Sequence, residues 1–301
     1  MKGKRNRRVV GDHVQGYSFL APAVLIVGLF TFAAIFFAIF MSFHKINLFK
    51  GEMQFIGLDN YIKMLSLDKT RTALANTLRF AAVVAPVQTV LSLVIAAALN
   101  ARIRAKLGFR IVFFLPTLTS SAALTMIFMF LFSIPGPFNR ILLGVHLIPE
   151  ALNWTNEIRF ALKVIMAMNI WSTAPFFMTL YLAALQDVPD SLYEAASVDG
   201  ANGIRQFFHV TVPHMRPITT FVFVTSIIGT LQMFDQAYIM SNGSGGPSNA
   251  TLTVALLIYQ DAFGMQNAMG RASALALILA CVILVFGTLA NRLGKTDKLY
   301  G

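Results

Sequence analysis

Cysteine and charged residues are both scarce in this chain, and each shortage excludes a class of protein. Cys281 is the only cysteine among 301 residues, so an internal disulfide framework and a metal site built from several thiolates are excluded. Only 12% of the residues are charged, whereas 56% are hydrophobic, and the mean hydropathy is +0.68. A soluble domain of this length needs more polar surface than that. The composition therefore predicts a membrane protein with several spans.

Motifs for nucleotide binding and for catalysis are also missing. Gly294-Lys295-Thr296 resembles the end of a phosphate-binding loop, but that loop requires a glycine where Leu289 stands. The metalloprotease pattern HExxH and the nucleophile pattern GxSxG do not occur. We therefore expect no catalytic residue, no metal site and no cofactor in this chain, and any ATP must be bound by another subunit.

Six stretches of about 18 or more residues carry no formal charge, which is long enough to cross a hydrocarbon core of about 30 Å as a helix. Barrel strands are disfavoured because the stretches lack alternation of polar and apolar residues. No repeat or Gly/Ser-rich linker divides the chain. The prediction is an all-α integral membrane protein with a single domain, residues 1–301. Its predicted spans are 17–43, 80–99, 111–133, 164–186, 217–240 (charge-free to 234 and extended past Asp235) and 272–291.

Basic residues flank these spans and predict their orientation. The basic N-terminal cluster would also fit a signal peptide, but the apolar run after it is too long, and Ala21-Pro22-Ala23 lies at its start. Six spans place both termini on one side, and more than half of the 24 basic residues fall on that side. Both termini and the loop 187–216 are therefore expected in the cytoplasm. The net charge of +11 then reflects contact with membrane lipid rather than nucleic acid. Residues 55–65 predict a short amphipathic helix at the interface.

The polar loop 187–216 predicts two short helices joined by a tight bend. Ser191 and Glu194 have the spacing of a capping box, so a first helix should begin there. Gly200 can take a positive φ and end that helix. A second helix should begin at Ala201-Asn202.

The end of this second helix carries residues suited to a protein contact. Pro213 and Pro217 are expected to end the helix and lead into the fifth span. Phe207 or Phe208 could fill a pocket on a partner protein. An ordinary folded loop that packs only on its own spans is the alternative.

The loop resembles the pattern E-A-A-x-x-D-G-A-x(5)-F-x-x-I-x-x-P-x-x-x-P of permease subunits of binding-protein-dependent ABC sugar importers. Val210 stands where isoleucine is usual. Further similarity lies at residues 55–61 (FIGLDNY), 114–116 (FLP) and 238–243 (YIMSNG) followed by Gly246-Pro247, so the resemblance covers the whole chain. The residues that match the loop pattern are Glu194, Ala195, Ala196, Asp199, Gly200, Ala201, Phe207, Pro213 and Pro217.

The resemblance to this type I, maltose-type carbohydrate uptake family implies a fold and a set of partners. The fold would be six transmembrane helices with a cytoplasmic coupling-helix loop. The partners would be a second homologous permease, an ABC ATPase dimer, an extracytoplasmic solute-binding protein and a sugar-type substrate, in a bacterial or archaeal cell membrane. The matching loop residues, with Phe208, would transmit the movement of the ATPase to the spans.

Polar residues inside the spans are candidates for the substrate pathway, because such groups are costly in lipid. Amides and carboxylates offer the paired donors and acceptors that sugar hydroxyls need, and an aromatic face can cover the C–H side of a sugar. Hydrogen bonding between helices is the alternative use of such residues, and Gln88 and Ser92 share one face of the second span. By the resemblance, the pathway candidates are Asn169, Trp171, Ser172, Gln232 and Asp235.

Three alternatives stay open at the level of sequence. A self-sufficient secondary transporter should carry ion-coupling carboxylates at mid-membrane and an internal duplication, whereas this chain has one intramembrane acidic residue, Asp235, and no evident repeat. An integral membrane enzyme lacks support because catalytic motifs are missing. Among importers, a glycerol-phosphate-type cargo is the alternative to a sugar or polyol.

Overall fold

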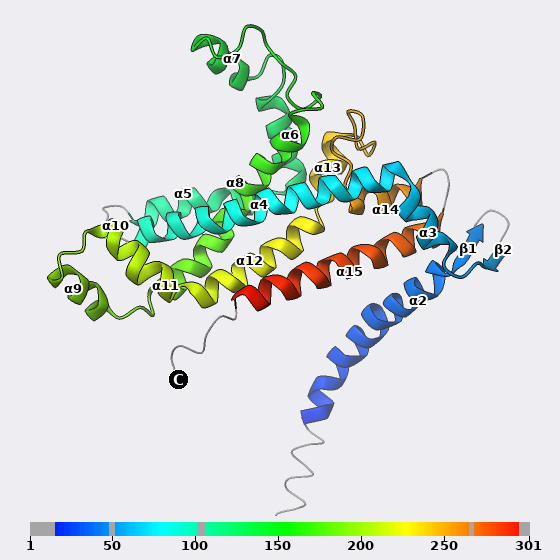
Figure 1. The fold of residues 1–301 in the computed structure, drawn as a ribbon, viewed down its shortest axis with the longest axis horizontal. Helices are drawn as coiled ribbons and strands as arrows, with labels where there is room; N and C mark the ends of the chain where they lie inside the picture. The colour runs from blue at the N-terminus through cyan, green and yellow to red at the C-terminus, as the bar shows by residue number, and fades with distance from the viewer. Residues whose placement is uncertain (1–15, 48–51, 101–105, 265–267, 295–301) are drawn as a thin grey trace, which may run out of the picture. The chain divides into compact units, whose positions relative to one another are not determined.

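The computed structural model describes residues 16–47, 52–100, 106–264 and 268–294, and the chain in these ranges is mainly helical (Figure 1). It divides into two compact units. Residues up to Met64 form one unit with Asp261–Leu277, and Leu65–Gln260 form the other with the residues from Ile278 onward. Lys295, Thr296 and the basic N-terminal cluster lie outside the described residues. The single-domain organisation stays a prediction.

Within the described ranges, five helices are long and apolar enough to cross a membrane, and a bent pair of helices supplies a sixth span. Each predicted stretch coincides with one of them, although the second helix begins at Asp68 rather than near residue 80. The prediction of a six-span helical protein is therefore confirmed. The five helices are Gly16–Ser42, Asp68–Asn100, Ala161–Leu185, Arg216–Met240 and Met269–Arg292, and the bent pair is Leu107–Leu118 with Ser121–Leu131.

The first unit joins an apolar helix to a β-hairpin and a short amphipathic helix. The Asn60 side chain holds them together, because its Nδ2 donates to the carbonyl oxygens of Ser42 at 2.8 Å and His44 at 3.0 Å. Ile62 is exposed and Met64 is buried, so the amphipathic helix predicted at residues 55–65 is confirmed from Asp59 onward, whereas Phe55 lies in a β-strand. The elements are a π-helical turn η1 (Gly28–Phe32), α2 (Ala33–Ser42), the antiparallel strands β1 (His44–Asn47) and β2 (Glu52–Phe55), and α3 (Asp59–Ser66).

Three long helices form the core of the second unit: α4 (Asp68–Asn100), α8 (Ala161–Leu185) and α12 (Arg216–Leu231). They pack against one another (Figure 1). Buried small residues on α4 allow the backbones to approach closely. These small residues are Ala81, Ala85 and Ala96. Near the polar loop the same helices bury an apolar cluster, which contains Leu99, Tyr181, Leu185, Met215 and Val222.

A polar junction, formed by Gln88, Ser92 and Ser226, ties these helices together inside the core. Gln88 Nε2 donates to the hydroxyl of Ser226 on α12. The Ser92 hydroxyl bonds to the Gln88 carbonyl oxygen and, at 2.9 Å, to that of Ala174 on α8. All three side chains are at most 1% exposed. The shared face of Gln88 and Ser92 is confirmed, and because a buried polar group needs a partner, the junction fixes which helix faces meet.

The third span is bent, so the prediction of one continuous helix over 111–133 is wrong. α5 (Lys106–Leu118) and α6 (Ser121–Leu131) meet at 98°. Between them, Ser120 takes an extended conformation with ψ 144° and accepts a hydrogen bond from the Ala123 N–H at 3.3 Å. A serine N-cap of this kind starts a new helix. Counting charge-free residues does not detect such a cap.

Asn139 organises the segment between α6 and α8. It lies at 0% exposure on α7 (Pro137–Gly144). Its Nδ2 donates to the carbonyl oxygens of Ser133 at 2.9 Å and Leu152 at 2.7 Å. Its Oδ1 accepts from the Leu152 N–H at 3.2 Å and from Trp154 Nε1 at 2.9 Å. The Asn139 side chain thus holds the start of this connection, at Ser133, next to its later part, at Leu152 and Trp154.

The fifth span is also interrupted, because α12 ends at Leu231 and α13 (Asp235–Met240) begins after a break. The hydroxyl of Thr253 donates to the Met233 carbonyl oxygen in this break at 3.0 Å. On α4, the Asn76 amide donates to the Leu252 carbonyl oxygen at 3.0 Å, which holds the same connection. The chain then continues through α14 (Val254–Phe263) and α15 (Met269–Gly294).

Replacing the Asn139 amide tests its organising role. Asn139→Ala leaves the Leu152 N–H and the Trp154 Nε1–H without an acceptor, so the free energy of unfolding should fall by about 2 kcal/mol or more. Thermal unfolding of the detergent-solubilised protein measures this change, and Asn156→Ala, at an exposed position of the same connection, is the control. Equal unfolding midpoints for the two variants would show that Asn139 has no such role.

Candidate functional site

The first helix of the polar loop, α9, spans Asp190–Val198. It begins after Pro189, whose extended conformation (φ −61°, ψ 130°) precedes the first turn, and no side chain caps it. The predicted capping box of Ser191 and Glu194 is therefore wrong. The physical reason is that the helix starts one residue earlier, with the Asp190 carboxylate in the first turn, where it interacts favourably with the helix dipole.

The bend after α9 is a Schellman turn centred on Gly200. Its φ is +77°, and its N–H donates to the Ser197 carbonyl oxygen at 3.0 Å. The Ala201 N–H donates to the Ala196 carbonyl oxygen at 2.9 Å. Both hydrogen bonds are those of the Schellman motif, and glycine takes the left-handed conformation at little cost. The prediction that Gly200 takes a positive φ and ends the first helix is confirmed.

The second part of the loop is a series of short helical segments. Asn202 caps the first of them by accepting from the Arg205 N–H at 3.0 Å, so the predicted start is confirmed. Pro213 and Pro217 lie in the first turns of the last two segments. Backbone N–H groups there have no acceptor within the helix, so proline costs no hydrogen bond. The prediction that these prolines end the helix is therefore wrong. The segments are α10 (Gly203–Gln206), a π-helical turn η2 (Phe207–Thr211), α11 (Val212–His214) and then α12.

Polar side chains join the two halves of the loop. Gln206 Nε2 donates to the Ser197 hydroxyl at 2.8 Å and to the Ala201 carbonyl oxygen at 3.3 Å. The hydroxyls of Tyr193 and Thr211 lie 3.0 Å apart. Neither Gln206 nor Tyr193 belongs to the sequence pattern of the loop. Both could have been found by asking which polar side chains of the two predicted helices face each other across the bend. These bonds make the loop one stiff piece.

The loop is anchored to the membrane-spanning core at two aromatic residues. Tyr193 and Phe207 pack against the apolar cluster at the ends of α4, α8 and α12. Beside them a cavity of about 830 Å³ separates parts of the loop from the end of α4, with Ala97, Ala98 and Glu194 among its lining residues. Val210 and Val212 also pack against this cluster, and Val188 and Met215 belong to it, so the loop contacts the core through both of its ends.

The outer surface of the loop carries exposed apolar side chains. Val198 is 88% exposed, Ile204 70% and Phe208 60%. Phe208 lies edge-on to the half-buried Phe207, with ring centroids 5.1 Å apart. Of the two phenylalanines, Phe207 thus serves the core and Phe208 is available for contact. The pattern residues Glu194, Ala195, Asp199 and Gly200 are also exposed, whereas Ala196 and Ala201 are half-buried.

Three of the pathway candidates lie on α8, but they do not share one face. Asn169 and Ser172 are three residues apart and half-buried, and the Ser172 hydroxyl donates to the Asn169 carbonyl oxygen at 3.2 Å. Trp171 lies on another side of the helix and packs on Phe128 of α6, with ring centroids 5.7 Å apart. The structure therefore does not bring Trp171 together with Asn169.

The other two candidates lie at the interruption of the fifth span. Gln232 is the residue after α12, and Asp235 is in the first turn of α13, where both are exposed. Rings of Phe234, Tyr238 and Tyr259 gather next to them, with centroids 5.2–5.4 Å apart. The break places Gln232 and Asp235 outside one regular helix, so helical spacing does not relate their side chains. Within the described ranges, groups of three or more His, Cys, Asp or Glu side chains suited to a metal ion are not found.

Comparison with protein families gives a match over most of the chain. Residues 88–296 match the family described as the binding-protein-dependent transport system inner membrane component. This chain belongs to that family. It is therefore an inner-membrane transport component with several spans, whose transport system works with a solute-binding protein.

Relatives and solved structures agree with this assignment. The lactose transport system permease protein of Rhizobium radiobacter is 32% identical over 95% of both chains. The arabinooligosaccharides transport system permease protein of Bacillus subtilis is 33% identical over 94% of this chain and 89% of that one. A chain in the crystal structure of a bacterial alginate ABC transporter, in complex with its pentasaccharide-bound periplasmic protein, superposes with a TM-score of 0.83 at 20% identity over 98% of both chains. The predicted fold of a type I ABC importer permease is confirmed.

The stiffness of the loop can be tested at Gln206. Gln206→Ala removes the 2.8 Å hydrogen bond to Ser197 across the loop and the longer one to Ala201, each worth about 1 kcal/mol, so amide hydrogen exchange at residues 197–206 should become several-fold faster. Arg205→Ala is the matched control, because only the backbone N–H of Arg205 takes part in the N-cap. Unchanged exchange in Gln206→Ala would mean that the bend alone keeps the loop rigid.

Proposed function

We propose that this chain is the transmembrane permease subunit of an ABC transporter that imports a sugar, an oligosaccharide or a related polyol. The observation that carries the proposal is the loop from Glu194 to Pro217. It is braced internally, anchored to the core at Tyr193 and Phe207, and exposes apolar side chains on its outer surface. An exposed apolar surface on a rigid support is suited to docking in a cleft of another protein.

The partner at this loop is an ABC ATPase dimer, which supplies the ATP site that this chain lacks. The remaining partners are a second homologous permease and an extracytoplasmic solute-binding protein. Both termini and the loop lie in the cytoplasm, in agreement with the positions of the basic residues. When the ATPase closes on ATP, the loop moves with it, and the contacts of Tyr193 and Phe207 pass this movement to α4, α8 and α12.

The names of the relatives support the class of cargo. They transport lactose, arabinooligosaccharides and trehalose or maltose, and one transports sulfoquinovosyl glycerol. These compounds share many hydroxyl groups, which amide and carboxylate side chains recognise well. The direct test is ATP-dependent uptake of radiolabelled lactose, maltose, trehalose and arabinooligosaccharides by the complete transporter in vesicles. Uptake of glycerol phosphate but none of these sugars would select the alternative cargo.

A substitution at Gly200 distinguishes a loss of coupling from a loss of folding. Gly200→Pro cannot take φ +77° and removes the N–H bond to Ser197, so uptake should fall to background while the protein stays in the membrane. Gly203→Pro is the matched control, because Gly203 is the first residue of α10, where proline is tolerated, and Asn202 before it is extended. Glu194→Lys should also abolish uptake. Normal uptake by Gly200→Pro would contradict the coupling role of the loop.

A substitution at Asp235 tests the proposed substrate pathway. Asp235→Ala should weaken transport affinity for the cargo at least several-fold, because it removes a carboxylate acceptor, while ATP hydrolysis still responds to the loaded binding protein. The measurement is the concentration dependence of uptake in vesicles, and Glu150→Ala, at an exposed position between α7 and α8, controls for loss of a carboxylate elsewhere. An unchanged half-saturating concentration would assign Asp235 a structural role.

A further inference from the structure

The segment between α6 and α8 exposes a set of large apolar side chains. Phe138 and Asn139 of α7 face the segment itself, where Asn139 is buried and the Phe138 ring lies 4.5 Å from that of Phe132, centroid to centroid. Ile141 is 63% exposed and Leu147 is 72% exposed. Exposed apolar surface of this kind marks a site of interaction. The α7 patch, as we call it, consists of Ile134, Ile141, Val145 and Leu147.

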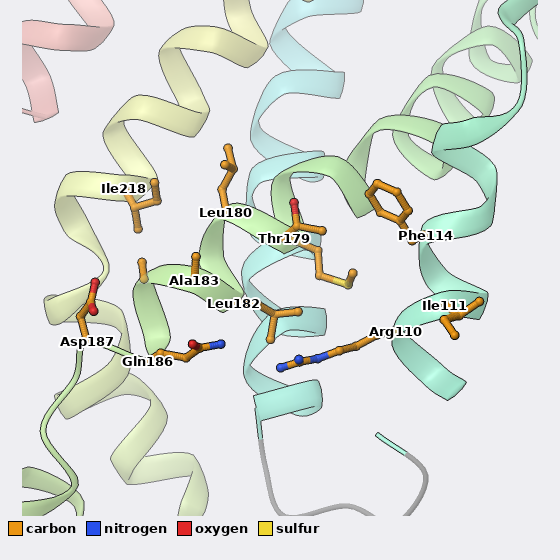
Figure 2. A pocket seen from close by; sticks show the side chains of 12 residues that line it. Arg110, Ile111, Phe114, Thr179, Leu180, Leu182, Ala183, Gln186, Asp187 and Ile218 are labelled. Atoms are coloured by element: carbon orange, nitrogen blue, oxygen red, sulfur yellow. The ribbon is translucent and has the colours of Figure 1, made fainter. Parts of the chain in front are cut away.

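The depth of this segment in the membrane follows from the length of α8. At the polar-loop end of α8, Gln186 and Arg110 of α5 line one groove, and Figure 2 shows both side chains there. Charged and amide groups of this kind mark an edge of the hydrocarbon core. The 25 residues of α8 extend over about 38 Å, whereas the core is about 30 Å thick. Ala161, the first residue of α8, therefore lies at the opposite surface of the membrane.

The start of α7 is held close to the end of α6. A Cβ at Gly136, the residue before α7, would collide with the backbone carbonyl oxygens of Phe130 and Leu131, so this approach requires glycine. The Gly136 N–H donates to the Ser133 carbonyl oxygen at 2.9 Å, which closes a turn between the two helices. The connection therefore keeps α7 at the level where α6 ends.

The α7 patch continues the apolar surface of α6. Met126 and Phe130, in the helix pair that forms the third span, are exposed, and Ile134 follows Phe130 by four residues. Exposed apolar side chains of a span contact the acyl chains of lipid. A patch that adjoins such a surface at the edge of the membrane can be covered by the same lipid.

The residues around the patch are of the kinds that favour a lipid interface. Trp154 packs between Phe138 and Phe160, with ring centroids 5.3 and 4.7 Å away, and tryptophan is enriched at the level of lipid headgroups. Arg140 of α7 and Lys163 of α8 are both exposed. Long basic side chains keep their methylene groups in apolar surroundings while the charge reaches lipid phosphates.

We propose that α7 is an interfacial helix whose patch is inserted among the acyl chains of the leaflet opposite to the polar loop. Arg140 lies at the level of the lipid phosphates. Through the turn at Gly136 and the hydrogen bonds of Asn139, this lipid contact holds the ends of α6 and α8 at a fixed depth. The inference goes beyond the proposed function, since it concerns lipid and does not depend on the cargo.

Spin labels at two positions of the patch test this insertion. Ile141→Cys and Leu147→Cys are each combined with Cys281→Ser, because the native cysteine is exposed, and are labelled with a nitroxide. The full chain, purified with its partner subunits, is placed in nanodiscs of phosphatidylethanolamine and phosphatidylglycerol. Electron paramagnetic resonance then measures collisions with oxygen, which concentrates in apolar surroundings, and with a neutral nickel chelate, which stays in water. The ratio of oxygen to nickel accessibility should be several-fold higher at both positions than at Asn156→Cys, an exposed polar position of the same segment.

Three results would overturn the proposal. A ratio at either position equal to that at Asn156→Cys would place the patch in water. Low accessibility to both reagents would mean that a protein such as the second permease covers the patch. High nickel accessibility that falls when the loaded binding protein is added would identify a docking surface for that protein.

A charge placed in the patch tests whether lipid holds α7 in position. Ile141→Asp should lower the oxygen-to-nickel ratio of the label at Leu147→Cys several-fold, because a carboxylate among acyl chains is costly and the patch should leave the lipid. Asn156→Asp, which adds the same charge at an exposed position, should leave the ratio unchanged. An unchanged ratio in Ile141→Asp would overturn the role of lipid, because contacts within the protein would then be enough to hold α7.

Discussion

Polar groups buried inside the spans need partners within the protein, and the rest of the structure depends on the hydrogen bonds of the polar junction, in which Gln88 Oε1 alone has no partner among the described residues. Gln88 donates to the Ser226 hydroxyl, and Ser92 donates to the Ala174 carbonyl oxygen. These bonds fix the rotation of α4, α12 and α8 about their own axes. Turning any of these helices by one residue would rotate it by about 100° and leave a buried polar group unpaired. The junction therefore decides which face of α8 is buried and which stays open along Asn169, Phe176 and Ala183.

The polar loop takes its position from the same helices. Tyr193 and Phe207 pack on the apolar cluster that α4, α8 and α12 form below the junction, and the Tyr193 and Thr211 hydroxyls close the loop across its base. Because the loop is braced internally and packs on the cluster through both of its ends, a force on its outer surface acts on α8 and α12 instead of deforming the loop. The exposed Val198 and Phe208 form an apolar surface on this braced loop.

Sequence reasoning succeeded where a local rule decides the structure and failed where a tertiary contact decides it. Stretches without charge located the spans, and the φ of Gly200 followed from the conformational freedom of glycine. The bend at Ser120 and the break at Gln232 stayed hidden, because a count of charge-free residues does not register an N-cap or a hydrogen bond from a distant hydroxyl such as that of Thr253. The role of Trp171 in a substrate pathway stays a prediction, and its contact with Phe128 on α6 is tertiary, so the sequence does not show it.

Pro175 lies inside α8, so a force on this helix can either bend it at the proline or move it as a rigid body. Proline lacks the N–H that would bond to the carbonyl oxygen of Trp171, which weakens the helix locally. However, the Ser92 hydroxyl holds the carbonyl oxygen of Ala174, the residue just before the proline, and Thr117 donates to Ser172 at 3.1 Å. Bending α8 there would break bonds that cost about 0.6–2 kcal/mol each in a membrane protein. Moving α5 together with α4, α8 and α12 breaks none of them, so a rigid-body response to force on the loop is favoured. Such a movement keeps the open face of α8 along Asn169, Phe176 and Ala183 continuous.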